Sequence, residues 1–366
     1  MTRYIYNIII LFLLFVFTAC NDEKMDMGSS GEHHPIYLSA AMNDRVITRA
    51  PYELTAPSTY KPLNVDVWAS TIEYQFRNEG LNGTGNDGKV SLHATARFQS
   101  SAPQLLNEAI YHETARPKVY FVAMYPQGWT TDDGTKALFT INGAQDVMFA
   151  PQIYGTYGTP YEQSPQLSFS HLLTWLTFEL KAESNEAINA WGKVKNIEIR
   201  SKNGVIVDLS GTAYNKVTDG DNATYNYLPG SCTFDNETLL PLYYKIPTNA
   251  TEDDKTLQDK FPGGYELTTL GSEVAYVLCA PVNATYEEGE EGNKTKTNEY
   301  TLYVETQYRN IEVGIDLKKK DGYFTGSTMG YKFNIQLNFK LGNTIAITAK
   351  MNDWTEGGII NKDVEE

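Results

Sequence analysis

The sequence predicts an all-β protein, with two tandem antiparallel β-sandwich domains behind a short N-terminal leader. Three observations predict this fold class. Short runs with apolar side chains at every second position recur along the chain. Clusters of Gly, Asn and Asp separate them as turns. Aromatic residues, which suit pleated and half-buried surfaces, are frequent, with 25 Tyr and 15 Phe. About a dozen strands exceed one seven-stranded sandwich, so we expect two.

The leader, residues 1–20, reads as a lipoprotein signal. Arg3 supplies a positive start, and the apolar core from Ile8 to Phe17 is ten residues long. That length suits a secretory signal and is too short to span a bilayer. The small residues before Cys20 resemble a bacterial lipobox, which predicts that Cys20 carries lipid. Phe17 departs from the usual Leu, so a plain secretory signal stays open as the alternative.

Residues 21–35 form a predicted tether. Their Gly, Ser and charged residues suit a flexible linker. Asp22 and Glu23, directly after the lipidated cysteine, resemble a signal for export to the cell surface. We therefore expect a surface-exposed lipoprotein of the outer membrane. The adjacent pair His33 and His34 lacks the spaced partners of a metal site.

The strands are predicted from period-two alternation, and two segments have helical character. Residues 101–113 are predicted to hold a short helix, and residues 185–193 a helical turn. The segment 151–166, rich in Gly, Pro and Tyr, is predicted as the boundary between domains 36–166 and 167–366. The predicted strands are residues 36–42, 63–71, 90–99, 118–126, 137–143, 173–182, 194–201, 205–211, 273–282, 299–308, 311–317, 331–339 and 344–351.

Composition and motifs exclude several classes of function. The formal charge of −15 argues against nucleic-acid binding, which needs clustered Lys and Arg. The segment 326–330, "GSTMG", has threonine where a hydrolase nucleophile would need serine. No phosphate-binding glycine loop and no spaced His/Cys set is present in the sequence. We therefore expect no enzyme activity, no cofactor and no metal. Cys232 and Cys279 are predicted either as one disulfide or as two buried thiols.

Four segments, in this order along the chain, resemble the fimbrillin-like lipoproteins, the major and minor pilins of type V pili. "VYFVAMYPQG" (119–128) resembles a first-domain strand of the family, and "QDVMFAP" (145–151) resembles the strand that follows it. "LSFSHLLTWLTFELKA" (167–182) resembles the family's F-x-H strand with apolar alternation. The segment 331–357 resembles its C-terminal hairpin, and "TRA" at 48–50 completes the pattern. His171 and Trp354 are expected to pack at strand ends.

The resemblance implies a transthyretin-like sandwich in each domain and a pilus (fimbrium) subunit that serves adhesion. It implies that an Arg-specific surface protease cuts between Arg49 and Ala50, with Arg45 as the second candidate. The strand at 36–42 then leaves, and a strand from another pilus subunit fills its place. The implied partners are other subunits, the protease, a host or bacterial surface ligand, and the outer membrane through the lipid on Cys20.

The alternative reading is a surface glycan-binding lipoprotein that does not polymerise. Tandem sandwiches on a lipid tether suit that role, and exposed tryptophans would supply a platform for sugar rings. Trp175 and Trp354 fall inside strand patterns and are expected in the core. Trp129 follows a turn and Trp191 lies in the helical turn, so these two are the candidates for exposure.

Overall fold

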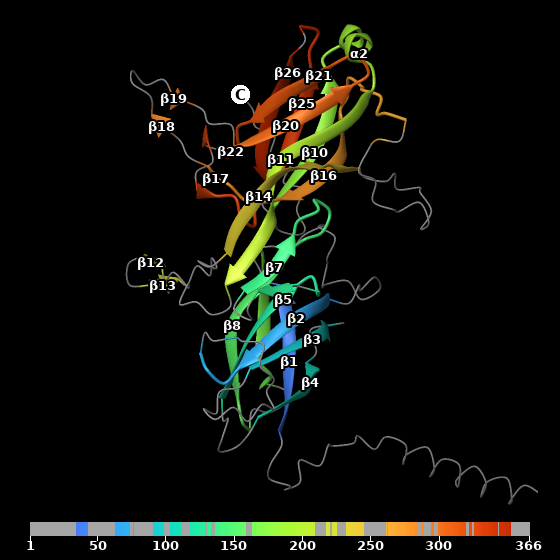
Figure 1. Cartoon of the computed structure of the whole chain (residues 1–366). Coiled ribbons are helices and arrows are strands. Elements are labelled where there is room, and N and C mark those ends of the chain that lie inside the picture. Colours follow the sequence, from blue (N-terminus) through green and yellow to red (C-terminus); the bar gives the residue numbers. More distant parts are fainter. Residues whose placement is uncertain are drawn as a thin grey trace, which may run out of the picture. The chain divides into compact units, whose positions relative to one another are not determined.

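The structure is a computed structural model, in which strands dominate and one short helix is described (Figure 1). It confirms the predicted all-β class. The residues that it describes are 34–42, 63–73, 76, 91–98, 103–111, 118–128, 130–132, 136–158, 163–208, 217–219, 222–224, 232–244, 261, 263–284, 287–288, 294–295, 299–319, 322–323, 326–342 and 344–352.

Seven strands from the first part of the chain form one sheet, drawn blue to green in Figure 1. Their order is β3-β2-β5-β8-β9-β1-β4. Neighbours are antiparallel except β1 and β9, which run parallel. The strands are β1 (His34–Met42), β2 (Leu63–Ser70), β3 (Ser91–Phe98), β4 (Gln104–Tyr111), β5 (Lys118–Tyr125), β8 (Met148–Thr156) and β9 (Gln166–His171).

A five-stranded and a six-stranded sheet follow. The five-stranded sheet has the order β15-β16-β10-β25-β26, and its β10–β25 pair is parallel. It contains β15 (Tyr243–Tyr244), β16 (Ser272–Cys279), β10 (Thr174–Ala182), β25 (Lys332–Phe339) and β26 (Ile345–Asn352). The six-stranded sheet has the order β21-β20-β11-β7-β6, with β14 (Cys232–Pro241) also paired to β11. It contains β21 (Asn310–Ile315), β20 (Tyr300–Thr306), β11 (Val194–Asp208), β7 (Lys136–Thr140) and β6 (Thr130–Asp132).

Four two-stranded ladders complete the described strands. The ladders are β12 (Val217–Asp219) with β13 (Asn222–Thr224), β17 (Asn283–Ala284) with β24 (Gly326–Ser327), β18 (Glu287–Glu288) with β19 (Lys294–Thr295), and β22 (Lys318–Lys319) with β23 (Gly322–Tyr323).

The buried apolar side chains fall into two clusters. The smaller cluster, which we call the first core, consists of side chains from the strands of the seven-stranded sheet, including β1. The larger cluster takes in the later sheets together with Trp68, Met124 and Phe149 from the first part of the chain. The pairing of β7 with β11 also joins the two parts by backbone hydrogen bonds. The chain from His34 to Glu366 accordingly forms one unit, and its division at residue 166 stays a prediction.

The predicted helix at 101–113 is wrong, because this segment contains β4. Its residues "QLLNEAIY" have good helix propensity, but pairing with β1 decides the outcome. The segment 151–166, predicted as the domain boundary, contains residues 151–156 of β8 and Gln166, the first residue of β9. In both segments, pairing with neighbouring strands outweighs the local conformational preference of the residues.

The two strands predicted at 194–201 and 205–211 are one strand, β11, which runs through the expected turn at Asn203-Gly204. Gly204 pairs with Asp235 of β14 and with Thr140 of β7. A Cβ atom at residue 204 would lie 1.8 Å from the Asp235 Oδ1 atom. Gly204 therefore lies within a strand and not in a turn, and the Asp235 side chain occupies the space that a Cβ atom would take.

The predicted helical turn is the helix α2 (Asn185–Trp191). Ser184 begins it as N-cap, since its hydroxyl accepts a hydrogen bond from the Ala187 N–H at 3.2 Å. Gly192 ends it with a φ of +67°, a conformation that glycine adopts at little cost. Among the described residues, no helix has the length and apolar character needed to cross a membrane.

Candidate functional site

The candidate site is the position of β1 in the seven-stranded sheet. β1 lies between β9 and β4, and its two halves have different partners. Residues 34–38 pair antiparallel with β4, from His34 opposite Tyr111 to Leu38 opposite Gln104. Residues 39–42 pair parallel with β9, from Ser39 opposite Gln166 onward. β1 therefore joins β4 to the rest of the sheet.

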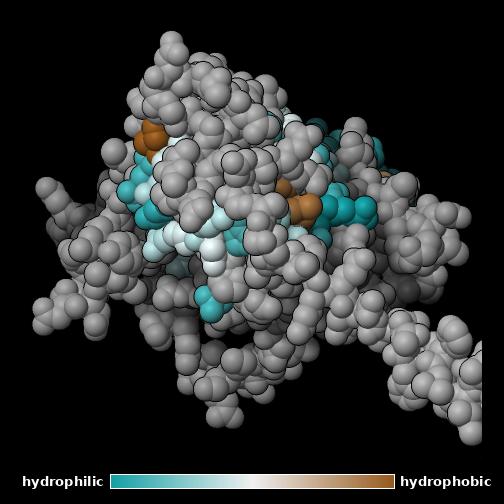
Figure 2. Space-filling view, turned by 90° about the horizontal axis from the view of Figure 1, so that it is seen from below, coloured by the Kyte–Doolittle hydropathy of each residue, from teal (hydrophilic) through white to brown (hydrophobic). Residues whose placement is uncertain are grey.

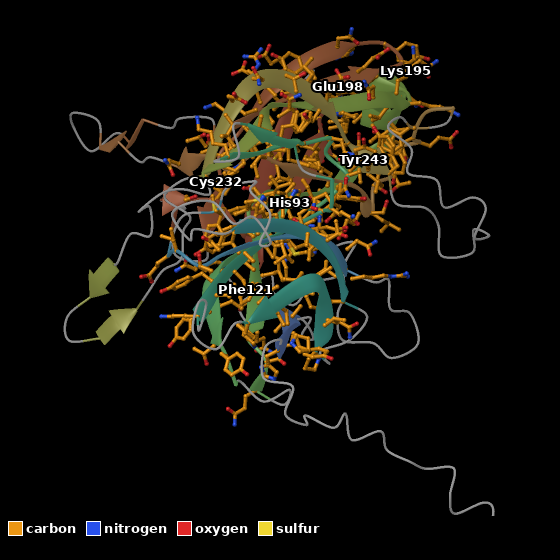
Figure 3. All side chains as sticks on the ribbon, turned by 60° about the horizontal axis from the view of Figure 1, so that its bottom comes forward. His93, Phe121, Lys195, Glu198, Cys232 and Tyr243 are labelled. Atoms are coloured by element: carbon orange, nitrogen blue, oxygen red, sulfur yellow. The ribbon has the colours of Figure 1, made fainter. Side chains whose placement is uncertain are left out.

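The inward face of β1 is part of the first core. Ile36, Leu38 and Ala40 are 0%, 1% and 1% exposed, as the alternation in the sequence requires. They belong to the same buried cluster as Phe121, which is labelled in Figure 3, and Phe169 of β9. Burying an Ile or Leu side chain contributes about 1.5–3 kcal/mol. β1 is thus a structural member of this domain core.

The middle of β1 is covered on both faces. Ser39 points away from Ala40, as neighbours in a strand do, and yet it is only 6% exposed. Its backbone N–H donates a 3.0 Å hydrogen bond to the Pro165 carbonyl oxygen, just before β9. Two small side chains therefore stand where the strand is enclosed on both sides.

The start of β1 is held by an aromatic contact. The His34 ring lies 6.2 Å from the Tyr111 ring and 5.6 Å from the Tyr157 ring, between centroids. The Gly158 N–H donates to His34 Nδ1 at 3.3 Å. Burial raises the pKa of the Tyr111 phenol, which keeps this ring neutral. The described strand begins at His34, two residues before the expected Ile36.

The predicted processing and lipidation residues, Arg49, Ala50 and Cys20, lie outside the described part of the chain. The described strand ends at Met42, seven positions before Arg49 in the sequence. The structure thus describes the strand that processing would remove. Cleavage after Arg49 and lipidation of Cys20 stay predictions.

The tryptophans that the structure describes are buried. Trp175 is 4% exposed, as expected of a core residue. The prediction that Trp191 is exposed is wrong. Its side chain is 0% exposed, and its indole N–H donates a 2.8 Å hydrogen bond to the Lys340 carbonyl oxygen, so it offers no surface to a sugar ring. Trp68 is 1% exposed. Trp129 and Trp354 lie outside the described residues, so of the two tryptophans expected to be exposed, one is buried and the other is not described.

His171 packs at the end of its strand, as expected, and His93 packs within a strand. His171, the last residue of β9, is buried and its ring contacts the Asp146 carboxylate. The ring of His93 stacks on Trp68 with centroids 4.7 Å apart, and its Nε2 lies 3.2 Å from Asp66 Oδ1. Figure 3 labels His93 among the side chains of its sheet.

The two cysteines within the described residues are free thiols, so of the two readings left open the disulfide is absent. Cys279 is fully buried, and its Sγ donates to the Thr174 carbonyl oxygen at 3.7 Å. Burial raises the pKa of both thiols, Cys232 and Cys279, to about 12. A raised pKa lowers the fraction of thiolate, which is the reactive form of a cysteine.

Within the described residues, no group of three or more His, Cys, Asp or Glu side chains could hold a metal ion. Figure 2 shows one face of the molecule, on which the coloured surface is mostly hydrophilic and the hydrophobic patches are small and separate. The candidate site therefore stays the position of β1. We call the space between β9 and β4 that β1 fills the groove.

Sequence reasoning missed both walls of this groove. β4 was expected to be a helix, and β9 was expected to open the second domain, but β9 pairs with β1 and β8. The alternation at Leu167 and Phe169 did indicate a strand. No local signal shows which strand lies beside it, since pairing is decided by the whole sheet.

No family model matches the sequence, and no curated protein matches it. Solved structures do match. A proposed cell adhesion protein from Bacteroides uniformis is 13% identical, with a TM-score of 0.47 and coverage of 88% of this chain and 99% of that chain. A proposed cell adhesion protein from Bacteroides ovatus is 15% identical, with a TM-score of 0.45 and coverage of 89% and 99%. The fimbrial anchor protein Mfa2 from Porphyromonas gingivalis is 10% identical, with a TM-score of 0.37 and coverage of 88% and 98%.

Proposed function

We propose that this protein is a structural subunit of a cell-surface pilus that serves adhesion. In this proposal it reaches the outer membrane as a precursor with lipid on Cys20. A surface protease cuts after Arg49, the leading strand leaves, and a strand from another subunit takes its place. The structural neighbours named above are adhesion and fimbrial proteins, which belong to the same class of function.

The observation that carries the proposal is that β1, at residues 34–42, is an internal strand of its sheet. It contributes Ile36, Leu38 and Ala40 to the first core. An N-terminal strand with this burial closes the domain while it is present. The precursor would therefore be a stable monomer that cannot polymerise.

Removal of β1 would create a binding site. The backbone groups that pair with it on β9 and β4 would lose their partners, and each unsatisfied buried group costs about 1–3 kcal/mol. The groove would also expose apolar side chains such as Phe169. An extended strand restores both the hydrogen bonds and the burial, which is β-strand addition. Repeated head to tail, this contact does not close on itself and makes a filament.

The chain itself contains a second strand with the side-chain order of β1. β1 has a large, a large and a small apolar residue at positions 36, 38 and 40. β26 repeats this order at Ile345, Ile347 and Ala349, and it stands at the edge of its sheet with β25 as its ladder partner. Ile345 and Ala349 are buried in the larger core cluster of the same chain, so β26 would have to leave its own sheet to act as the donor strand.

The test is limited digestion of the purified full-length precursor with an Arg-specific protease. The expected product begins at Ala50 by N-terminal sequencing and forms oligomers in size-exclusion chromatography after the released fragment is removed. Arg49→Ala should abolish the product that begins at Ala50, and Arg45→Ala, at the second candidate, should leave that product and its assembly unchanged. The double variant Arg45→Ala, Arg49→Ala should block the release of β1 and the assembly. Normal assembly of the Arg49→Ala protein would refute the processing site.

A further inference from the structure

The seven-stranded sheet carries a pair of tyrosines where β5 and β8 lie side by side (Figure 1). Tyr120 is directly opposite Tyr154 in the ladder, and their ring centroids are 6.2 Å apart. Gly155, the next residue, faces Tyr111 of the first core, so Tyr154 points to the other face of the sheet. Tyr154 is 57% exposed. The sheet therefore presents an open aromatic ring to solvent from a position fixed by two strands.

A lysine ammonium lies over this pair of rings. Lys118 Nζ is 3.8 Å from the centroid of the Tyr154 ring and 4.8 Å from that of the Tyr120 ring. A side-chain hydrogen bond with Tyr120 raises the pKa of Lys118, which favours the charged ammonium. A cation–π contact at an exposed site is weak, so the ammonium can move from the ring to an incoming anion at little cost.

Hydrogen-bonding side chains lie beside the rings. Gln152, two residues before Tyr154 on β8, donates from its side-chain amide to Glu73 Oε1 at 3.4 Å. Glu73 is exposed, and its charge acts on Lys118. We call these five residues, Glu73, Lys118, Tyr120, Gln152 and Tyr154, the tyrosine patch. It combines aromatic rings with one cation, one amide and one carboxylate.

The size and chemistry of the tyrosine patch favour a sugar over a protein as its ligand. A stable protein interface buries about 800 Å² on each partner around an apolar centre. The Tyr154 ring instead stands among polar groups, and Leu105, the other exposed large apolar side chain in the described strands of this sheet, lies on β4. A sugar ring offers apolar C–H groups that stack on an aromatic ring and hydroxyls that pair with amides and carboxylates.

We propose that the tyrosine patch binds a uronic acid residue of a surface polysaccharide, an inference that rests on the adhesive role proposed above and specifies its ligand. The sugar ring stacks on Tyr154, its carboxylate pairs with the Lys118 ammonium, and its hydroxyls bind Glu73 and Gln152. In a uronic acid the carboxylate is attached directly to the sugar ring, which matches an ammonium 3.8 Å from the stacking ring. The formal charge of −15 disfavours densely charged polyanions, so the patch suits a ligand with a single carboxylate.

The experiment is a ligand-observed NMR titration of the purified full-length chain with methyl glucuronide. Methyl glucoside, which has the same ring without the carboxylate, should bind at least about fivefold more weakly, because it offers the ammonium no anion. Tyr154→Ala and Lys118→Gln should each weaken glucuronide binding by at least about fivefold, whereas Tyr154→Phe keeps the ring and should bind as the wild type does.

Two matched controls test the position of the site. Tyr308→Ala removes a tyrosine that is 62% exposed, and Lys332→Gln removes an ammonium 3.8 Å from the ring centroid of the buried Trp175. Both should change glucuronide affinity by less than about twofold, because neither residue belongs to the tyrosine patch.

Equal binding of glucuronide and glucoside would overturn the inference, as would glucuronide binding that survives both Tyr154→Ala and Lys118→Gln. Tighter binding of a methyl sialoside, or of a hexaglutamate peptide, would also overturn it in favour of another acidic sugar or an acidic protein segment. Oligomer formation by the trimmed chain without glucuronide binding would overturn the ligand and leave the pilus function intact. Glucuronide binding by a chain that never assembles would support the patch and contradict the pilus function.

Discussion

At the scale of single residues, the first core depends on a few side chains of the leading strand. Leu38 is 1% exposed, whereas Leu105, on the neighbouring strand β4, is 48% exposed. The two leucines lie next to each other in the β1–β4 ladder, since Leu105 is opposite Tyr37. They form a natural pair of the same residue type in opposite environments.

Leu38→Ala should destabilise the intact chain by about 2–5 kcal/mol, because it removes a buried side chain and leaves a cavity. Leu105→Ala should change the free energy of unfolding by less than about 0.5 kcal/mol, as substitutions at exposed positions usually do. Urea denaturation followed by tryptophan fluorescence measures both. Equal effects of the two substitutions would mean that β1 does not belong to the core.

At the scale of elements, β4 depends on β1. The sheet order places β4 at the edge next to β1, so β1 is its hydrogen-bonded neighbour within the described residues. β2, by contrast, pairs with β3 on one side and β5 on the other. Loss of β1 therefore removes the ladder of β4 and leaves that of β2 complete.

Hydrogen exchange should report this difference. After cleavage and removal of the leading fragment, amides of residues 104–111 should lose protection, because opening free energies follow local pairing. Amides of residues 63–70 are the control and should keep theirs. Addition of the peptide of residues 34–42 should restore the protection of β4. Unchanged exchange in β4 without β1 would show that other contacts hold it.

At the scale of the whole molecule, backbone pairing and packing join segments that the sequence separates. β7 comes from the first part of the chain and pairs with β11 of the second. The larger core cluster includes Trp68 and Phe149 together with side chains of the later sheets. We therefore expect a destabilising substitution in one part to lower the stability of the other part as well.

The chain should consequently unfold in one cooperative transition. Differential scanning calorimetry should show a single peak, and urea curves from far-UV circular dichroism and from tryptophan fluorescence should coincide. Independent sandwiches would give two transitions instead. Two separated peaks would contradict the shared core and favour the division predicted at residue 166.

The sequence by itself determined the fold class and the inward face of the leading strand. Alternation places Ile36, Leu38 and Ala40 on one side whatever the strand packs against, since side chains in a strand point to opposite faces in turn. The N-cap Ser184 and the glycine after α2 are local signals of the same kind.

The tertiary structure alone decided which strands lie beside β1, that β4 is a strand, and that β11 continues through Gly204. These outcomes depend on hydrogen bonds between segments far apart in the chain, such as those between β1 and β9. Side-chain period is local and repeats every two residues, but ladder pairing is a property of the whole sheet. This is the physical reason why the strand was evident from the sequence and the groove that holds it was not.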